Sequence, residues 1–200
     1  MKKLVYLISP DKIEKNFYSD LNKVLSFKNV SFFQLRLKNI GPNNLLKIAK
    51  KIKKITTKHK VKFIINDNFI VSHKIRSDGC HMGQQDGSFE IARNKLKNKI
   101  LGITCHNSKI LAKKALKNKA DYLAFGSFFK SKLKPNAKKA KLNILRWAKN
   151  NINIPIIVIG GINNLNYKRL INAGANYIAI SSFIWDNPKL KPEFAIRKFK

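Results

Sequence analysis

Acidic residues and cysteines are scarce in this sequence. Only 10 of the 200 residues are Asp or Glu, against 42 Lys and Arg, and only two are cysteine. The two cysteines, Cys80 and Cys105, lack the spacing of a metal site and are too few for a disulfide framework. We expect both to be small buried side chains in strands, where an unreactive cysteine behaves as an apolar residue.

Long apolar segments are also missing. No run approaches the ~20 apolar residues that a membrane-spanning helix needs. The stretch after Met1 is closed by Ser9-Pro10, which makes it shorter than the apolar region of a typical signal peptide, and it has no small-residue cleavage site. We therefore expect a cytoplasmic protein without a membrane partner. Its 200 residues suffice for one domain, 1–200, with a sizeable core.

The excess of basic residues gives a formal net charge of +32. It raises the hypothesis of nucleic-acid binding, because phosphate backbones are bound by clustered Lys and Arg. The lysines are instead spread over nearly every predicted helix, and the chain is also rich in Asn and Ile, which suggests a compositional bias. Solvated helix faces and a basic binding surface both stay open, although we do not expect nucleic acid as a partner. In either case the positive field attracts anionic substrates, and salt weakens that attraction.

Short apolar runs alternate with amphipathic stretches along the chain. Positions 45, 48, 49, 52 and 55 are apolar at helical spacing, and a last helix opened by a proline is expected over Pro188–Lys198. Strands that alternate with helices imply parallel strands joined by right-handed crossovers. Eight such units close most naturally into a single small (β/α)₈ TIM barrel, an α/β fold, with an open doubly wound sheet as the alternative. The expected strands are Leu4–Ile8, Phe32–Leu37, Val61–Asn66, Gly79–Met82, Ile100–Thr104, Tyr122–Phe125, Ile154–Ile159 and Tyr177–Ile180.

In such barrels the functional residues lie at the carboxyl ends of the strands. The second strand ends with Gln34-Leu35-Arg36-Leu37-Lys38, and alternation places Gln34, Arg36 and Lys38 on one face. Polar groups directed into a barrel mouth need polar partners, because desolvation otherwise penalises them. An edge strand with one hydrated face is the alternative explanation of the pattern.

Two of the scarce acids, Asp67 and Asp86, follow apolar strand-like runs. Hard cations such as Mg²⁺ are bound by one or two carboxylates together with waters and substrate phosphates. The same positions also suit Asp as the N-cap of a helix. Position alone does not decide between a cation site and a pair of helix caps.

Small and hydroxyl residues follow the last two strands. Gly160-Gly161 and Ser181-Ser182 match the place where TIM barrels bind phosphate through backbone N–H groups. The lysine-rich stretch Lys130–Lys138 fits either a flap over a site or a solvated connection. His81 fits a packed core residue better than a general base, whereas His106 lies in a loop from which it could contact a ligand. The sequence has no nucleophile elbow, P-loop or dinucleotide fingerprint.

These strand ends, taken in order, resemble those of the thiamine-phosphate synthase family over nearly the whole chain. The segment Gly79–Asp86 is similar to the family's Gly-x-His-Leu-Gly-Gln-x-Asp, and residues 34–38 are similar to its Gln-Leu-Arg-x-Lys. Further similar segments are Ile65-Asn66-Asp67, Gly102–His106 (family Gly-x-Ser-x-His), Asp121–Gly126 followed by Phe128-Phe129, Ile159–Ile162, Ala173-Gly174-Ala175 and Ser181-Ser182.

The resemblance implies a transferase that joins 4-amino-5-hydroxymethyl-2-methylpyrimidine diphosphate to a thiazole phosphate, giving thiamine monophosphate and pyrophosphate. The implied chemistry is dissociative: pyrophosphate leaves, a pyrimidine cation forms and the thiazole nitrogen attacks it, so charge stabilisation and positioning take the place of a protein nucleophile. The resemblance also implies Mg²⁺ on Asp67 and Asp86, and it is compatible with a homo-oligomer. The implied catalytic residues are Lys38, Thr104, Ser131 and Lys134, and the implied substrate-binding residues are Gln34, Arg36, Lys38, Asn66, Thr104, Ser131, Lys134, Gly161, Ser181 and Ser182.

The flap departs from the family pattern. The family has Pro-Thr-x-Thr-Lys, whereas this chain has Lys130-Ser131-Lys132-Leu133-Lys134, so Leu133 replaces a hydroxyl donor. A missing hydrogen bond to a charged group costs roughly 1.5–3 kcal/mol, which slows a reaction ~10-fold or more if the bond acts in the transition state. Two other functions therefore stay open: a thiazole tautomerase-like isomerase on the same fold, and a non-enzymatic basic protein that binds nucleic acid.

Overall fold

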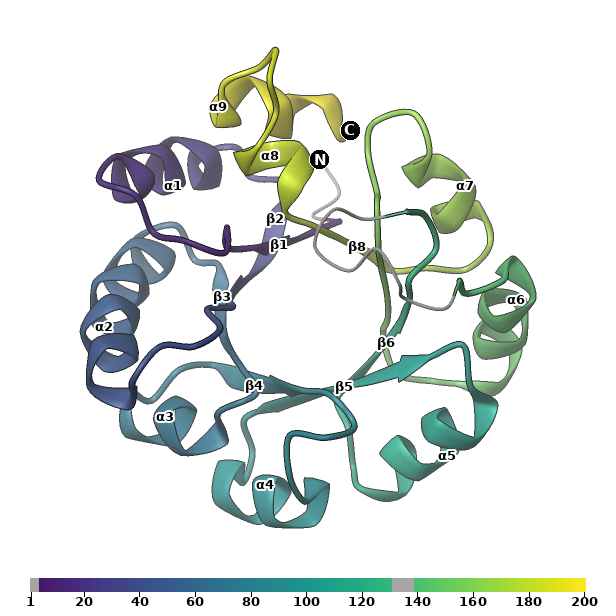
Figure 1. The fold of residues 1–200 in the computed structure, drawn as a ribbon. Helices are drawn as coiled ribbons and strands as arrows, with labels where there is room; N and C mark the ends of the chain where they lie inside the picture. The colour runs from purple at the N-terminus through teal and green to yellow at the C-terminus, as the bar shows by residue number, and fades with distance from the viewer. Residues whose placement is uncertain (1–3, 131–138) are drawn as a thin grey trace.

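The computed structural model describes residues 4–130 and 139–200, and within them the strands form one closed barrel in chain order. Figure 1 shows the ring of strands enclosed by helices. All neighbouring strands are parallel, including β1 and β8, which close the ring. The predicted TIM barrel is confirmed, and the open sheet is wrong. The strands are β1 (Val5–Ile8), β2 (Val30–Leu35), β3 (Lys62–Asn66), β4 (Gly79–Met82), β5 (Ile100–His106), β6 (Tyr122–Gly126), β7 (Ile156–Ile159) and β8 (Tyr177–Ile180).

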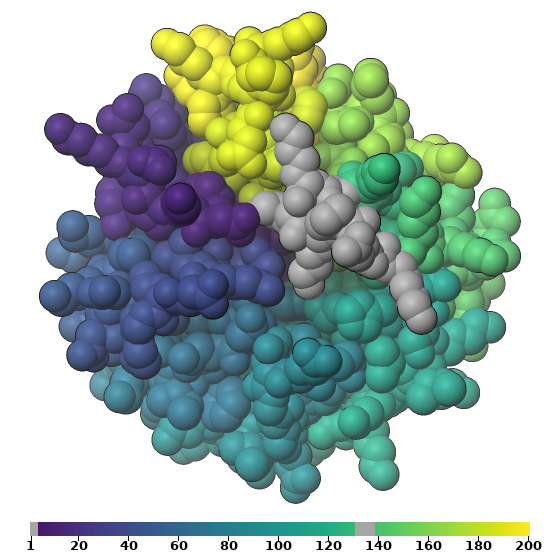
Figure 2. Space-filling view, viewed as in Figure 1, coloured from purple at the N-terminus to yellow at the C-terminus, as the bar shows by residue number. Residues whose placement is uncertain are grey.

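The helices follow the strands and cover the outside of the barrel (Figure 1). In the space-filling view of the same face, the first segments of the chain lie beside the last ones, as the pairing of β1 with β8 requires (Figure 2). No helix in the part of the chain described here is long and apolar enough to cross a membrane. The helices are α1 (Phe17–Ser26), α2 (Pro42–Lys58), α3 (Phe69–Lys74), α4 (Phe89–Leu96), α5 (Lys109–Lys117), α6 (Leu142–Asn151), α7 (Tyr167–Asn172), α8 (Ser182–Trp185), α9 (Pro192–Ala195) and the 3-10 helix η1 (Ile196–Lys198).

The end of β2 differs from the prediction. The strand runs over Val30–Leu35 instead of Phe32–Leu37. Arg36 leaves the ladder because its N–H donates to the Ser9 hydroxyl at 2.9 Å, and its carbonyl accepts from the same hydroxyl at 3.1 Å. The Ser9 side chain thus replaces two strand hydrogen bonds and ends β2.

The single helix predicted over Pro188–Lys198 is wrong. Helix α8 follows β8 directly, and α9 begins only at Pro192, which occupies the favourable first helical position. Between them the Asn187 side-chain oxygen accepts the N–H groups of Lys189 and Leu190 at 3.0 and 3.1 Å. An Asn that binds the following backbone in this way stabilises a turn in place of a helix.

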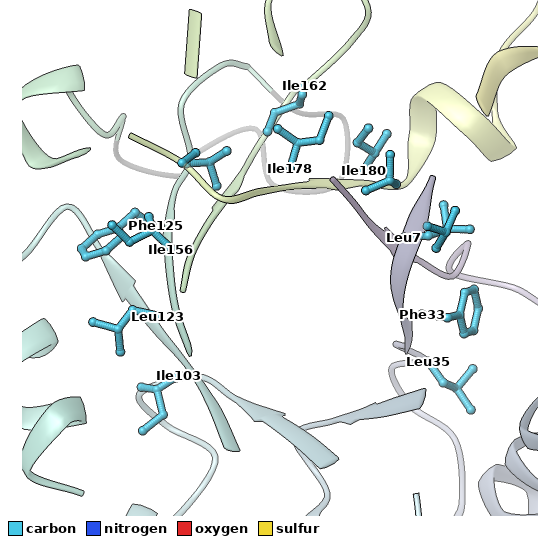
Figure 3. Packing of buried hydrophobic residues seen from close by; sticks show 14 of the residues in the cluster. Leu7, Phe33, Leu35, Ile103, Leu123, Phe125, Ile156, Ile162, Ile178 and Ile180 are labelled. Carbon is cyan, nitrogen blue, oxygen red and sulfur yellow. The ribbon is translucent and has the colours of Figure 1, made fainter. Parts of the chain in front are cut away.

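Apolar side chains form two layers because residues alternate across each strand. Leu7, Phe33, Leu35 and Ile103 point outward and pack against the helices, in the larger core (Figure 3). The smaller inner core lies inside the ring and consists of Tyr6, Ile8, Tyr122, Ala124, Ile157 and Ala179.

The two cysteines lie where the sequence predicts them. Cys80 in β4 and Cys105 in β5 are buried and form no disulfide. Burial raises the pKa of both thiols, because the thiolate would lose its hydration. They are therefore unreactive packing residues.

Candidate active site

The carboxyl ends of the strands surround a cavity of about 890 Å³. Its size lies within the usual range for small-molecule sites. Two predicted residues, Ser131 and Lys134, lie outside the described residues, as does Leu133 of the proposed flap. Every other predicted site residue lines this one cavity: Gln34, Arg36, Lys38, Asn66, Asp67, Asp86, Thr104, Gly161, Ser181 and Ser182.

The end of β2 supplies an amide and two cations to the cavity. Gln34 is only 3% exposed, and its side-chain N–H donates to the Tyr6 hydroxyl at 3.1 Å, which offsets the cost of burying the amide. The Arg36 guanidinium is held by Asp11 at 3.0 Å and is 14% exposed, whereas Lys38 is exposed. The alternation of polar residues at 34, 36 and 38 therefore places one buried dipole and two positive charges on the same wall.

Asp67 and Asp86 meet on the neighbouring wall. Asp67 follows β3 in the left-handed backbone region, at φ 63°, and its N–H donates to the His81 carbonyl at 2.7 Å. Asp86 lies in the loop after β4, where one carboxylate oxygen accepts the Gly83 N–H at 2.6 Å. A Cβ on Gly83 would come within 2.8 Å of that oxygen, so a larger residue there would displace the Asp86 carboxylate.

The two carboxyl groups strongly influence each other. Burial, followed by a hydrogen bond and the negative charge of Asp86, raises the pKa of Asp67 to about 7, while the charges of Arg36 and Lys38 oppose the shift. Two carboxylates held this close cannot both ionise freely without a cation, because like charges repel. The arrangement therefore favours either a shared proton or a bound positive ion.

Neither acid caps a helix. The N-cap of α3 is Asn68, whose side-chain oxygen accepts the Val71 N–H at 2.9 Å. The N-cap of α4 is Ser88, whose hydroxyl accepts the Ile91 N–H at 3.3 Å. The helix-cap explanation of Asp67 and Asp86 is wrong, since the capping positions belong to the residues that follow them.

The donor set fits Mg²⁺. No group of three or more His, Cys, Asp or Glu residues converges anywhere in residues 4–130 and 139–200, so an all-protein cage is absent from this part of the chain. Mg²⁺ keeps several waters and usually needs only one or two carboxylates plus substrate phosphates, whereas a structural Zn²⁺ site needs four ligands. Asp67 and Asp86, which line the cavity beside Arg36 and Lys38, supply the two carboxylates that Mg²⁺ needs. They do not supply the four ligands of a structural Zn²⁺ site.

His81 lies beneath this rim as a packed, hydrogen-bonded ring, as the sequence favoured. Its Nδ1 lies 2.9 Å from the Tyr122 hydroxyl and its Nε2 lies 2.8 Å from the Thr104 hydroxyl. The Gln84 side chain donates to the Thr104 carbonyl at 2.5 Å. His106 lines the cavity from the end of β5, where a bulge after Thr104 shifts the register and gives His106 a φ of 51°.

Another wall of the cavity is formed by the ends of β7 and β8. Gly160 and Gly161 have φ of 107° and 60°, and a Cβ on them would lie 1.9 Å from the Ser127 hydroxyl and 2.3 Å from the Lys130 carbonyl. These glycines therefore let the loop after β6 pack directly on the loop after β7, beyond any role in binding phosphate. The Ser181 hydroxyl donates to the Ser9 carbonyl at 3.0 Å.

Ser9 joins the two walls. This residue after β1 is 2% exposed, and its N–H donates to the Gln34 carbonyl at 2.9 Å. Together with its bonds to Arg36 and Ser181, Ser9 connects the ends of β2 and β8 across β1. The cations and the Gly/Ser wall are thus fixed relative to each other by one small side chain and its backbone.

Sequence reasoning missed part of the cavity lining. Asn107, whose side chain accepts the Lys141 N–H at 3.1 Å, and Ser108, which caps α5, follow β5 in an irregular loop where strand alternation gives no signal. Gln84 and Gln85 lie inside Gly79–Asp86, and the similarity of this segment to the family motif could have indicated that they line the cavity. Further polar lining residues outside the predicted set include His81, Ser127 and Lys139, and His106, which the sequence placed where it could contact a ligand, also lines the cavity.

Comparison with known proteins gives consistent matches. Residues 5–184, which include every cavity-lining residue named above, match the protein family described as thiamine monophosphate synthase. A thiamine-phosphate synthase of Pelagibacter ubique is 56% identical over 200 residues, covering 100% of this chain and 97% of that protein. One of Erythrobacter litoralis is 38% identical over 186 residues, covering 90% and 87%. The solved structure of a thiamine phosphate pyrophosphorylase from Pyrococcus furiosus superposes with a TM-score of 0.87 at 26% identity, covering 98% of this chain and 93% of that one.

Proposed function

This chain belongs to the thiamine monophosphate synthase family and acts as a thiamine-phosphate synthase, a transferase, and on that premise we propose how its cavity divides the work. The pyrimidine diphosphate binds against the wall formed by Gln34, Arg36, Lys38 and Asn66, with Thr104 at its edge. The thiazole phosphate binds against the wall formed by Gly161, Ser181 and Ser182 at the ends of β7 and β8. The support is that both groups of residues line one cavity, on either side of Ser9.

The proposed reaction is a dissociative substitution at the exocyclic methylene carbon of the pyrimidine. The C–O bond to the diphosphate breaks and its electron pair leaves with pyrophosphate; the thiazole nitrogen then uses its lone pair to form the new C–N bond. Arg36 and Lys38 stabilise the growing negative charge of the leaving group, and the Thr104 hydroxyl donates to it. No protein nucleophile is required, since the walls hold both substrates in the orientation for transfer.

Asp67 and Asp86 would hold Mg²⁺. When bound, the ion would neutralise diphosphate oxygens and so make pyrophosphate a better leaving group. The supporting observation is the raised pKa of Asp67, about 7, because a carboxyl pair that resists double ionisation is relieved by a cation.

The carboxyl pair facing Arg36 and Lys38 in one cavity is the single observation on which this division rests. The test incubates the protein with both substrates and varies Mg²⁺, measuring thiamine monophosphate and pyrophosphate. We expect equal amounts of the two products and a rate that saturates with Mg²⁺. A rate that is unchanged in excess chelator would contradict the metal assignment, and pyrophosphate release without thiamine monophosphate would contradict the thiazole wall.

The isomerase and the nucleic-acid-binding alternatives have no comparable support. An isomerase acting on the thiazole phosphate alone needs neither the carboxyl pair nor the cations of β2, and all of them are present. The relatives named above are synthases. A cytoplasmic location and a homo-oligomeric assembly stay predictions.

A further inference from the structure

A chain of hydrogen-bonded side chains crosses the interior of the barrel below the cavity. The Gln34 amide lies 3.1 Å from the Tyr6 hydroxyl, which lies 2.7 Å from the Tyr122 hydroxyl. From Tyr122 the contacts continue at 2.9 Å to His81 Nδ1 and from His81 Nε2 at 2.8 Å to the Thr104 hydroxyl. This floor network links five strands, and three of its members, Gln34, His81 and Thr104, line the cavity.

The network lies in an otherwise apolar interior. Tyr6 and Tyr122 are each 2% exposed, in the inner core with Ile8 and Ala124. Burial raises the pKa of both phenols, so each keeps its proton and acts as a neutral donor and acceptor. Buried hydroxyl groups of this kind lower stability unless each is hydrogen-bonded, which makes the network costly as a mere filler of the core.

The fold makes room for the network at Gly102. A Cβ on this residue of β5 would lie 1.9 Å from the ring of Tyr122. Without a side chain there, the Tyr122 phenol reaches across the barrel and stacks on His81, with ring centroids 5.6 Å apart and planes 10° from parallel. The position of the Tyr122 hydroxyl is therefore fixed by packing as well as by its two hydrogen bonds.

The direction of every hydrogen bond in the floor network follows from the bond made by Gln34. The Gln34 amide nitrogen can only donate, so Tyr6 accepts from it and has its own proton left to give. Among the residues that the structure describes, the acceptor in contact with that proton is the Tyr122 hydroxyl, which then donates to His81 Nδ1. With Nδ1 as acceptor, the neutral imidazole carries its proton on Nε2 and donates it to the Thr104 hydroxyl.

We propose that the floor network positions the Thr104 proton. Because the Thr104 oxygen accepts from His81, its own O–H is free to point into the cavity and donate to an anion there. Tyr6, Tyr122 and His81 are thus positioning residues that act through Thr104; Tyr6 and Tyr122 lie outside the cavity lining, whereas His81 reaches the cavity beside Thr104. The identity of that anion as the departing diphosphate rests on the proposed function.

If the hydrogen bonds of the floor network ran in the opposite direction, the Thr104 proton would point away from the cavity. If the Gln34 amide were turned over, every bond would reverse, His81 would carry its proton on Nδ1, and Thr104 would donate downward to Nε2. The Thr104 oxygen would then offer only lone pairs to the cavity, which would repel a diphosphate. The side on which His81 carries its proton therefore distinguishes the two directions.

The first test determines which ring nitrogen of His81 carries the proton, in the protein without substrates. Nitrogen-15 NMR of protein labelled in histidine distinguishes the Nε2–H from the Nδ1–H tautomer, and a His81→Gln variant assigns the His81 signals among the four histidines. At pH 8 we expect His81 as the Nε2–H tautomer, and loss of that tautomer preference in Tyr122→Phe. An Nδ1–H tautomer in the unmodified protein would overturn the proposal.

The second test asks whether Tyr122 acts through Thr104. Tyr122→Phe removes only the hydroxyl, and we expect kcat to fall about 10-fold, the size of one lost hydrogen bond to a developing charge, with an unchanged KM for the thiazole phosphate. In Thr104→Val, which lacks the hydroxyl, adding Tyr122→Phe should have almost no further effect. In Thr104→Ser, which keeps it, the full effect should return. If adding Tyr122→Phe to Thr104→Val lowered kcat by the same factor as in the unmodified protein, the proposal would be overturned.

Tyr177→Phe is the matched control. Tyr177 belongs to the same inner layer but contacts Phe32, at 5.2 Å between ring centroids, instead of the floor network. We expect its kcat and its His81 signals to equal those of the unmodified protein. The NMR test needs no turnover, so an unmodified protein that makes no thiamine monophosphate would contradict the proposed function while the tautomer still decides the direction of the network.

Discussion

Two pairs of acids lie at opposite ends of the same barrel, and their surroundings differ. At the amino ends of the strands, Asp78 accepts the Phe63 N–H at 2.8 Å and faces Lys62 at 3.3 Å. Asp121, before β6, accepts the Leu101 N–H at 2.7 Å and pairs with Arg93 at 2.5 Å. At the carboxyl ends, Asp67 and Asp86 face each other, and the pKa of Asp67 is raised to about 7.

The difference separates structural acids from functional ones. A carboxylate that receives a backbone N–H and a cation has its charge stabilised within the fold itself. A carboxylate that faces another is destabilised when ionised, and Arg36 and Lys38 offset this only in part, so a cation from outside would stabilise the pair further. In a chain with ten acids, this contrast of surroundings identifies the functional pair better than the presence of Asp.

The largest effect should come from breaking the functional pair. Asp86→Asn removes one charge that would hold Mg²⁺, and we expect kcat/KM to fall roughly 10²-fold or more, as when a preorganised electrostatic group is lost. Steady-state assays over a range of Mg²⁺ measure the fall, and circular dichroism checks the fold. Asp78→Asn is the matched change at the other end and should leave the rate per folded molecule unchanged. Equal losses in both variants would remove the distinction between the two ends.

Breaking a structural acid should lower stability and leave catalysis unchanged. Asp121→Ala deprives the Leu101 N–H and the Arg93 guanidinium of their carboxylate, and we expect the free energy of unfolding to fall by about 2 kcal/mol. Arg93 keeps its bonds to the Lys97 and Lys119 carbonyls, which limits the loss. Denaturant unfolding measures the change. Asp20→Ala, which breaks a 3.9 Å pair with the exposed Lys23 near the start of α1, is the control expected to lose much less stability.

Removing the charge of a functional acid should instead raise the stability of the protein when metal is absent. The folded-state pKa of Asp67 lies above its value of 3.8 in the unfolded chain, so the stability contributed by its proton is present below about pH 4 and is lost as the pH rises through about 7. Asp67→Asn carries no such charge, and Asn tolerates the left-handed backbone at this position. In chelator at pH 8 we expect Asp67→Asn to be more stable by about 1 kcal/mol, a value discounted for the partial exposure of the group.

Thermal unfolding at pH 5 and pH 8 tests this sign. The gain of Asp67→Asn over the unmodified protein should be larger at pH 8, and Mg²⁺ should raise the melting temperature of the unmodified protein more than that of the variant. A variant that is less stable than the unmodified protein at pH 8 would show that the Asp67 charge is stabilised by the fold, like that of Asp121.

The smallest effect should come from removing the helix cap at Ser88, and it tests whether Asp86 has a structural role at the start of α4. Ser88→Ala removes the hydroxyl that accepts the Ile91 N–H, and we expect α4 to lose about 0.5–1 kcal/mol of stability with no change in kcat. When this variant is combined with Asp86→Asn, the two changes in stability should add, because Asp86 is not the cap. Strong coupling between the two substitutions, measured in urea, would return Asp86 to a structural role.

Much of the fold could be predicted because barrel strands repeat a local pattern. The predicted bounds of Gly79–Met82 and Tyr177–Ile180 agree with β4 and β8, since each run lies between polar or turn-forming residues. The end of β2 could not be predicted, because it depends on Ser9, 27 residues earlier in the chain than Arg36. The last helix was misplaced because Pro188 and Pro192 have the same helix-starting preference, and the Asn187 turn decides between them.

The candidate site was predictable to the extent that strand ends determine it. Asp67, Asp86 and the alternating Gln34, Arg36 and Lys38 all reach one cavity, as their positions after strands indicated. The contact between Tyr6 and Tyr122 joins residues 116 apart, and no local pattern marks it. It depends on the missing side chain of Gly102, which is visible only once β5 and β6 are paired.

The bonds made by Ser9 have a consequence for how the enzyme responds to heat. The ring of strands closes between β1 and β8, and the same small residue there separates the two proposed substrate walls. A local opening of the contacts made by Ser9 would change the spacing between the two reactants without requiring the hydrophobic layer outside the strands to unfold. Turnover should accordingly decline at temperatures where the far-ultraviolet spectrum is still that of an intact barrel.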